Sequence, residues 1–189
     1  MADNIPTKAS TGKPKPAGAI WIGATSATLP TDAKTAVGAA FTNLGSVSDE
    51  GVKNNTSRKV GSIKDWSGAE VLAPQEEFED NFTLTLIDAK DINVLKAVYG
   101  DGNVKGSYEA GISVQVSPEE LEYRAWIIDM ILSDGDLKRI VIPKGKITGI
   151  GEISYNGTDA VGYAITIKAA PDATGFTHHE YLIKKPTTT

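Results

Sequence analysis

Residues 78–86 alternate between apolar and polar side chains along the chain. Because successive side chains of a β-strand point to opposite faces, this pattern predicts a strand with one face in a core and the other in water. The apolar face would consist of Phe78, Phe82, Leu84 and Leu86, and the polar face of Glu79, Asn81, Thr83 and Thr85. One-sided strands of this kind are typical of antiparallel sheets.

Further strand and turn signals extend this pattern over most of the chain. Residues 112–117 and 161–168 alternate in the same way. Two dipeptides typical of tight hairpin turns, Asp134-Gly135 and Asn156-Gly157, each lie between two strand-like segments;. The chain is therefore predicted to be mainly antiparallel β.

One helix is predicted between Asp88 and Gly100. Asp88 can cap its N-terminus, and glycine is typical of the position that ends a helix. Apolar side chains recur between them at helical spacing: Ile92, Leu95, Val98 and Tyr99;. This stripe favours packing against a sheet over binding of a cofactor. The predicted fold is an antiparallel β-sandwich or partly closed barrel with one flanking α-helix.

Two segments do not fit a simple monomeric sandwich. Residues 122–132, which include Tyr123 and Ile127, are apolar on both faces, so this strand needs a second cover from the helix or from another subunit;. The span 53–77 is too long for an ordinary hairpin loop and carries isolated apolar residues. Long loops of this composition are usually functional or ordered by a partner.

The chain divides into one central domain and two terminal segments. Residues 1–18 are rich in Lys, Pro, Ser and Thr and are predicted to form a flexible arm;. Residues 19–180 would form the β-domain, with 53–77 as a long loop, and residues 181–189 a C-terminal tail. Trp21 lies in a short apolar segment that can anchor the arm to its own core or to that of a neighbour.

Charge and composition exclude several classes of protein. The net charge of −5 argues against a protein that binds nucleic acid by neutralising phosphates;. The absence of cysteine excludes a disulfide scaffold and thiol-based metal sites;. No apolar run approaches the roughly 20 residues needed to span a bilayer. An acidic region at 76–101 and a later basic group that includes Arg139 suit head-to-tail contacts between copies, although charge alone favours an ordinary solvated surface;.

No set of residues indicates catalysis, a metal or a cofactor. The carboxylates of Glu119 and Glu120, like those of Glu76 and Glu77, are adjacent, so on a strand they point to opposite faces and cannot converge on one bond. His178 and His179 are interpreted as surface histidines. The chain is therefore predicted not to be an enzyme and to need no cofactor.

An ordered series of short motifs resembles the phage major tail proteins, which form the tail tube of long-tailed, non-contractile bacteriophages. The motifs are Gly18-Ala19-Ile20-Trp21-Ile22, Leu29-Pro30-Thr31-Asp32, Leu44-Gly45-x-Val47-Ser48-x-x-Gly51-Val52, Ile63-Lys64-Asp65-Trp66-Ser67-Gly68, Val94-Leu95-Lys96-x-Val98-Tyr99-Gly100 and Arg139-x-Val141-x-Pro143. The resemblance spans about residues 15–180.

The resemblance implies a structural virion protein of the tail that is assembled in the host cytoplasm. Subunits would form hexameric rings that stack into a tube, with 53–77 reaching the adjacent ring and strands joining between neighbours. Residues expected at contacts between subunits are Trp21, Ile63, Trp66, Val71, Leu72, Tyr123 and Ile127.

The implied partners are other copies of the chain and the tape measure, tail tip and terminator proteins, with no membrane partner. DNA would pass through the lumen without specific binding. The polar face at Glu79, Asn81, Thr83 and Thr85 is expected to be net acidic and to line the lumen, unless it faces solvent outside. The alternatives are a monomeric β-sandwich module that binds or decorates a virion, and a secretion-system tube subunit of similar fold.

Overall fold

The computed structural model describes residues 8–16 and 18–185. Nine strands form its main sheet: β1 (Gly12–Pro14), β2 (Ile20–Ala24), β3 (Phe41–Asn43), β4 (Lys53–Val60), β7 (Gln75–Leu86), β10 (Arg124–Leu132), β11 (Leu137–Ile150), β12 (Tyr163–Ala169) and β13 (His179–Ile183). Two small ribbons pair β5 (Ile63–Lys64) with β6 (Glu70–Leu72), and β8 (Val104–Ser107) with β9 (Gly111–Val114). The helix α1 (Ile92–Tyr99) is followed by a 3-10 turn at Asp101–Asn103.

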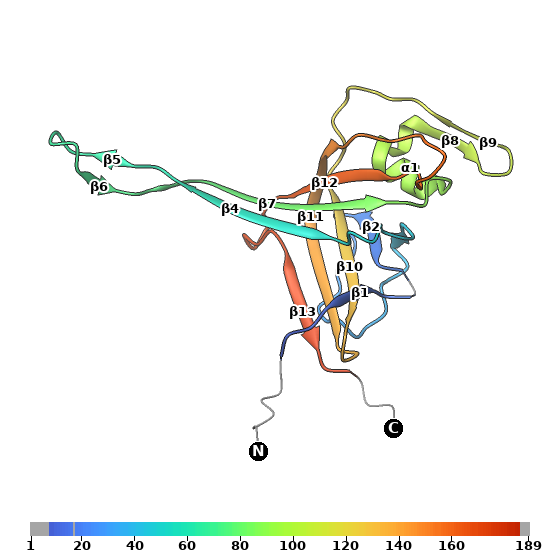
Figure 1. Ribbon diagram of the computed structural model, residues 1–189, viewed down its shortest axis with the longest axis horizontal. Coiled ribbons are helices and arrows are strands. Elements are labelled where there is room, and N and C mark those ends of the chain that lie inside the picture. Colours follow the sequence, from blue (N-terminus) through green and yellow to red (C-terminus); the bar gives the residue numbers. More distant parts are fainter. Residues whose placement is uncertain (1–7, 17, 186–189) are drawn as a thin grey trace, which may run out of the picture.

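The main sheet is antiparallel and curls into a half-barrel (Figure 1). Its strands run in the order β3-β2-β10-β11-β12-β7-β4, with β1 also paired to β10 and β13 also paired to β11. The prediction of a mainly β, partly closed barrel with one flanking helix is confirmed. The alternating segment at 112–117 contributes only to the β8–β9 ribbon, outside the main sheet.

The main core lies between one face of the sheet and the helix. Its fully buried side chains include Trp126 of β10 and Phe82 of β7, and α1 contributes Val94, Leu95 and Val98. The stripe at helical spacing therefore packs on the sheet, as its pattern indicates. The alternation in β7 is also confirmed in the C-terminal half of the strand, where Phe82, Leu84 and Leu86 are buried.

The two hairpin predictions have different outcomes. Gly135 adopts a φ of 88° and donates its N–H to the Leu132 carbonyl, so a tight turn joins β10 to β11. At Asn156, β11 and β12 do pair, but residues 151–162 form a longer loop between them. The Asn156 side chain accepts the backbone N–H groups of Thr158 and Asp159, which closes a local turn at the loop's tip;.

The helix begins three residues later than predicted. Asp91, and not Asp88, is the N-cap, because its carboxylate accepts the Asn93 N–H at 2.8 Å;. Asp88 instead accepts the Ser46 N–H at 2.8 Å, which joins the loop that contains Ser46 to the segment before the helix. Gly100 ends the helix with a φ of 94°, as predicted;.

Residues 53–77 are a β-ribbon, so the prediction of a long loop is wrong for this segment. β4 pairs with β7 from Lys53↔Thr83 out to Val60↔Gln75, and the β5–β6 ribbon continues to the tip. Figure 1 shows this pair of strands leaving the half-barrel as a long projection. We call residues 57–79, which include its tip, the arm, because Thr56 and Asp80 are the last pair before the projection.

Both predicted terminal segments are partly strands. Residues 1–18 were predicted to be a flexible N-terminal segment. Of these, residues 12–14 pair with β10 as β1, and residues 1–7 and 17 lie outside the described residues. In the predicted tail at 181–189, residues 181–183 belong to β13, and residues 186–189 lie outside the described residues. The sheet therefore extends beyond both boundaries of the predicted domain.

Candidate functional site

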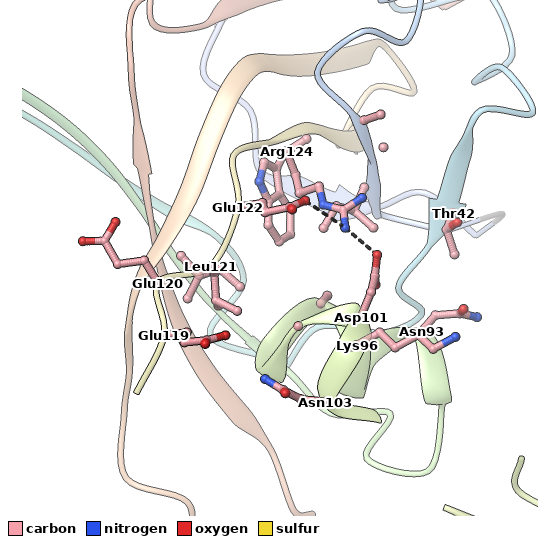
Figure 2. A pocket seen from close by; sticks show the side chains of 18 of the residues that line it. Thr42, Asn93, Lys96, Asp101, Asn103, Glu119, Glu120, Leu121, Glu122 and Arg124 are labelled. Carbon is pink, nitrogen blue, oxygen red and sulfur yellow. Dashed lines mark hydrogen bonds and ion pairs between the residues drawn. The ribbon is translucent and has the colours of Figure 1, made fainter. Parts of the chain in front are cut away.

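A cleft with a volume of about 570 Å³ lies between the end of α1 and the start of β10. Figure 2 shows its charged side chains. Arg124 forms ion pairs with Asp101 at 2.5 Å and with Glu122 at 3.7 Å, so its charge is balanced within the cleft. Glu119 and Glu120 point in different directions, and Glu120 binds Lys146 at 2.7 Å. These carboxylates do not converge on one point, so the cleft lacks the paired groups of a general acid and base.

The residues that the structure describes carry neither a metal-binding cluster nor a helix suited to a membrane. Within residues 8–16 and 18–185, no three His, Asp or Glu side chains are grouped closely enough to hold a metal ion. Over the same ranges, no helix combines the length and apolar character needed to cross a bilayer.

The arm carries a group of exposed apolar side chains near its tip. Trp66, in the turn at its tip, is fully exposed, and the nearby β-strands expose four more large apolar side chains by half or more: Val60, Ile63, Val71 and Leu72. Ile63 and Leu72 are cross-strand partners. Soluble monomers rarely present so many neighbouring apolar side chains, which usually mark a contact with another molecule. Four of the residues expected at subunit contacts are thus brought together at one site.

The root of the arm is held by a buried carboxylate that the sequence interpretation missed. Asp80 of β7 has no exposed surface and accepts hydrogen bonds from Asn54, Thr56 and Thr177. Its second oxygen also lies 2.5 Å from His178 Nδ1. His178 is therefore not a free surface histidine. The signal was present in the sequence, since Asp80 falls between Phe78 and Phe82 on the face predicted to be apolar.

The polar face of β7 differs from its prediction in charge. Asn81, Thr83 and Thr85 do point away from the main core, because their neighbours on the strand point into it;. Glu79, however, binds Lys168 of β12 at 2.6 Å, so its negative charge is compensated. Lys53 of β4 lies opposite Thr83 and is paired with Glu50 at 2.5 Å, so its charge is compensated as well. The face is polar but not net acidic.

The strand that is apolar on both faces is covered by its own chain. Ala125 and Ile127 of β10 lie in a second core cluster with Phe41 and Val141. The segment between β2 and β3 packs onto this cluster through Ala27, Leu29 and Val37, with Trp21 and Tyr181 beside them. Ile127 has no exposed surface, so the structure does not leave it available for the subunit contact that was expected. This second face of β10 therefore needs no cover from α1 or from a neighbouring subunit.

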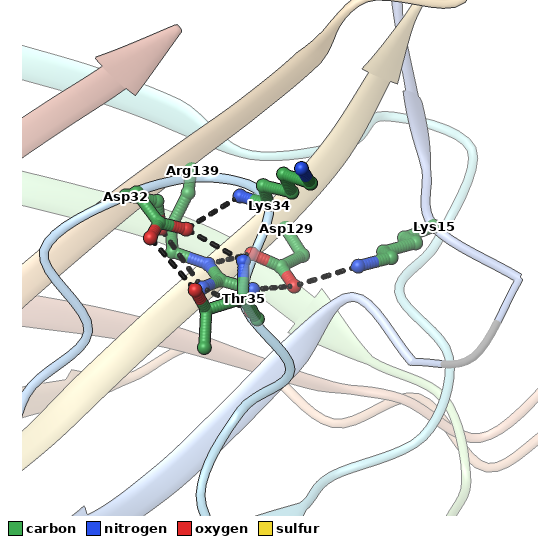
Figure 3. Close-up of polar contacts among 6 residues, drawn as sticks. All are labelled: Lys15, Asp32, Lys34, Thr35, Asp129 and Arg139. Carbon is green, nitrogen blue, oxygen red and sulfur yellow. Dashed lines mark hydrogen bonds and ion pairs between the residues drawn. The ribbon is translucent and has the colours of Figure 1, made fainter. Parts of the chain in front are cut away.

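A buried ion pair fastens that covering segment (Figure 3). Arg139 of β11 binds Asp129 of β10 through two nitrogens, at 2.5 and 2.7 Å, and both side chains are almost completely buried. Arg139 also donates to the backbone carbonyls of Asp32 and Thr35, while Lys15 lies 3.6 Å from Asp129. Arg139 is therefore part of the interior and not of a basic surface patch.

Tyr123 and Trp21 are only partly available to a partner. Tyr123 is 41% exposed, and its ring lies under the ammonium groups of Lys144 and Lys146, at 4.7 and 5.1 Å from its centroid;. Trp21 is half-buried against the second cluster, and within the described residues its indole N–H is buried without a hydrogen-bond partner. Neither side chain lies at the tip of the arm.

A family model described as phage tail tube protein matches residues 15–188. The chain belongs to the phage tail tube protein family. No curated protein matches it. Among solved structures, it is similar to the cryo-EM structure of the anti-feeding prophage cap, the tube-terminating cap, with 12% identity and a TM-score of 0.44 over 97% of this chain and 100% of that chain.

Family membership makes this tail tube protein a structural component of the virion and not an enzyme. The motif from Ile63 to Gly68 lies in the distal turn of the arm, where Gly68 adopts a φ of 86°. The motif from Val94 to Gly100 is the end of α1.

Acid is expected to weaken the root of the arm in this tail tube protein. Burial raises the pKa of Asp80, but hydrogen bonds from Thr177, Asn54 and His178 together hold that pKa below its ordinary value. A carboxyl group with a lowered folded-state pKa stabilises the fold above the unfolded-state pKa, and this contribution is lost as the pH falls through the folded value. The free energy of unfolding should therefore decrease below about pH 4.

The measurement is urea denaturation at neutral pH and at about pH 3 for the wild type and Asp80→Asn. Asp172 also loses stabilising interactions in acid, because the Thr174 hydroxyl is the main cause that lowers its pKa to about 2. Asp172 is present in both proteins, so the difference between them isolates Asp80. An equal loss of stability in the two proteins would contradict the prediction.

Proposed function

We propose that this protein builds the tail tube by self-assembly, with the apolar tip of each arm docking on a copy in the adjacent ring. The observation that carries the proposal is the group of exposed side chains at Ile63, Trp66, Val71 and Leu72, held away from the half-barrel on a ribbon of paired strands. A flexible loop would have to be ordered on binding, whereas a paired ribbon presents these residues already arranged.

Burial of the tip supplies a driving force of useful size. Removing one large apolar side chain from water contributes about 1.5–3 kcal/mol. Several such side chains lie within the tip, so one docked arm offsets part of the entropy that is lost when a subunit joins the tube. Docking of a tip on a different surface of the next copy is a head-to-tail contact, which can repeat without limit along a tube.

Within a ring, we propose that neighbours join through strand edges. In the described part of the chain, β4 and β13 each have a strand partner on only one side. Their outer edges present backbone N–H and C=O groups that can pair with another copy, and closing strands into a shared barrel would satisfy them. We take the ring to contain six copies, as the resemblance to major tail proteins implies.

We propose the polar face of β7 as the wall that DNA passes during ejection. Asn81, Thr83 and Thr85 are uncharged, and the paired charges of Glu79 and Lys168 leave little net field. Such a wall would not hold phosphates by the release of counterions that drives tight DNA binding. A nearly uncharged wall in this proposal takes the place of the acidic wall that was expected to repel the DNA phosphates.

The same proposal includes the partners that a tube requires at its ends and inside it. These are a tape measure protein in the lumen, a tail tip that starts the tube and a terminator that ends it, in a long-tailed, non-contractile phage. Assembly would take place in the host cytoplasm.

The test is negative-stain electron microscopy of concentrated protein, with light scattering on dilute protein. Hollow tubes or stacked rings are expected at high concentration. A particle that stays monomeric at every concentration and salt, and also after a tail-tip complex is added, would overturn the proposal and favour a monomeric binding module.

A further inference from the structure

Asp80 marks the point at which the arm leaves the half-barrel. Along β7, Phe82 and Asp80 have no exposed surface, whereas Phe78, the next residue on that face toward the tip, is 36% exposed. Residues 75–78 are all exposed. A two-stranded ribbon beyond this point has no sheet neighbour, and isolated hairpins are only marginally stable. The direction of the arm therefore depends on how it is fastened at residue 80.

The Asp80 carboxylate joins two parts of the chain that are far apart in sequence. Asn54 Nδ2 and Thr56 Oγ1 of β4 donate to one oxygen, at 2.8 and 3.1 Å. Thr177 Oγ1 lies 2.7 Å from the other oxygen, and His178 Nδ1 lies 2.5 Å from the same atom. Thr177 and His178 immediately precede β13, so one buried group connects the arm to the C-terminal strand.

The opposite face of the ribbon is held at the neighbouring residue. Glu79 precedes Asp80 on β7, so its side chain points to the opposite face, where it binds Lys168 of β12 at 2.6 Å;. On the Asp80 side, the His178 ring packs edge-on against Phe82 with 5.2 Å between ring centroids. The ribbon is thus fixed from both faces within two residues of its exit.

We propose that Asp80, with Thr177 and His178, forms a positioning cluster that sets the direction of the arm and couples it to β13. This inference rests on the proposed role of the arm in stacking. An arm with a fixed direction meets the next ring without loss of conformational freedom, whereas a loose arm must be ordered each time a subunit adds. Because β13 also has a free edge, a neighbour that pairs with it contacts the strand that begins at the cluster.

The test measures the direction of the arm in free subunits. The chain contains no cysteine, so Ala69→Cys at the tip and Thr148→Cys on β11 give two unique sites for spin labels. Double electron–electron resonance on dilute protein is expected to give one narrow distance distribution. In Asp80→Asn the distribution should be about twofold wider or more, and tubes should require roughly tenfold more protein.

Two further variants keep the test decisive. Thr177→Val removes one donor and leaves the carboxylate in place, so an intermediate width is expected even where Asp80→Asn folds poorly. Glu122→Gln changes an exposed carboxylate in the cleft and should match the wild type. An unchanged width in Thr177→Val and Asp80→Asn would overturn the proposal. Tubes that form equally well with a widened distribution would overturn the positioning role alone, while wild type that never assembles would overturn the stacking function and this role with it.

Discussion

Replacing Trp66 with alanine is expected to raise the protein concentration at which tubes form by roughly 30- to 1,000-fold. Trp66 is fully exposed in the free subunit, so its whole surface is available for burial on docking. Truncation of a central interface aromatic typically costs about 2–4 kcal/mol, and each 1.4 kcal/mol or so corresponds to a factor of ten. The free subunit should lose almost no stability, because Trp66 does not pack on its core.

Sedimentation at a series of concentrations, with electron microscopy of the pellets, measures this effect. Tyr155→Ala is the matched control, because Tyr155 is 75% exposed in the loop between β11 and β12, away from the arm. Trp126→Ala provides a contrast, since Trp126 is buried in the main core and its loss should lower stability by about 3–5 kcal/mol;. Unchanged assembly of Trp66→Ala would show that the tip makes no stacking contact.

Arg139→Met should give the largest loss of stability among single changes to the polar groups, about 3–5 kcal/mol in the free energy of unfolding. The variant leaves the Asp129 carboxylate buried, with Lys15 as its remaining cation. It also removes the donors that hold the carbonyls of Asp32 and Thr35. The segment between β2 and β3 would then be fastened to the second cluster by apolar contacts alone.

Urea denaturation of the free subunit tests this value. Arg124→Met is the matched control, because the Arg124–Asp101 pair is partly exposed and such pairs contribute about 1 kcal/mol or less;. The double variant Asp129→Leu/Arg139→Met should recover part of the loss, since no buried charge then lacks its partner. A loss below 1 kcal/mol in Arg139→Met would contradict the view that this pair secures the covering segment.

Local sequence patterns predicted the mainly antiparallel β fold and its flanking helix. Several details were wrong where the role of a residue depends on distant parts of the chain. The alternation around Phe82 and the turn at Gly135 are decided by neighbours in sequence, so both predictions are confirmed. The cap at Asp91 was missed because Asp88 satisfies the same local rule, and only its bond to Ser46, 42 residues away, separates the two.

The candidate site was only partly predictable for the same reason. The apolar residues of the tip were recognised, but their segment was taken for a loop, because its longest strand before the tip, β4, is almost entirely polar, is exposed on both faces and shows no alternation. The partners of Asp80 at Thr177 and His178 lie almost 100 residues away, and no spacing rule connects them. Similarly, nothing local indicates that Ala27, Leu29 and Val37 cover Ile127.

The arm is only two strands wide, and this width has a consequence for when tubes grow. A single tip offers a few side chains, which is too small a contact to hold two free subunits together against the entropy of association. In the proposed assembly, a completed ring would present all of its arms at once, so the contacts would act as one multivalent binding event with a high effective concentration. Growth would then favour existing ring surfaces over pairing in solution, and a large pool of subunits could remain unassembled until a first ring is in place.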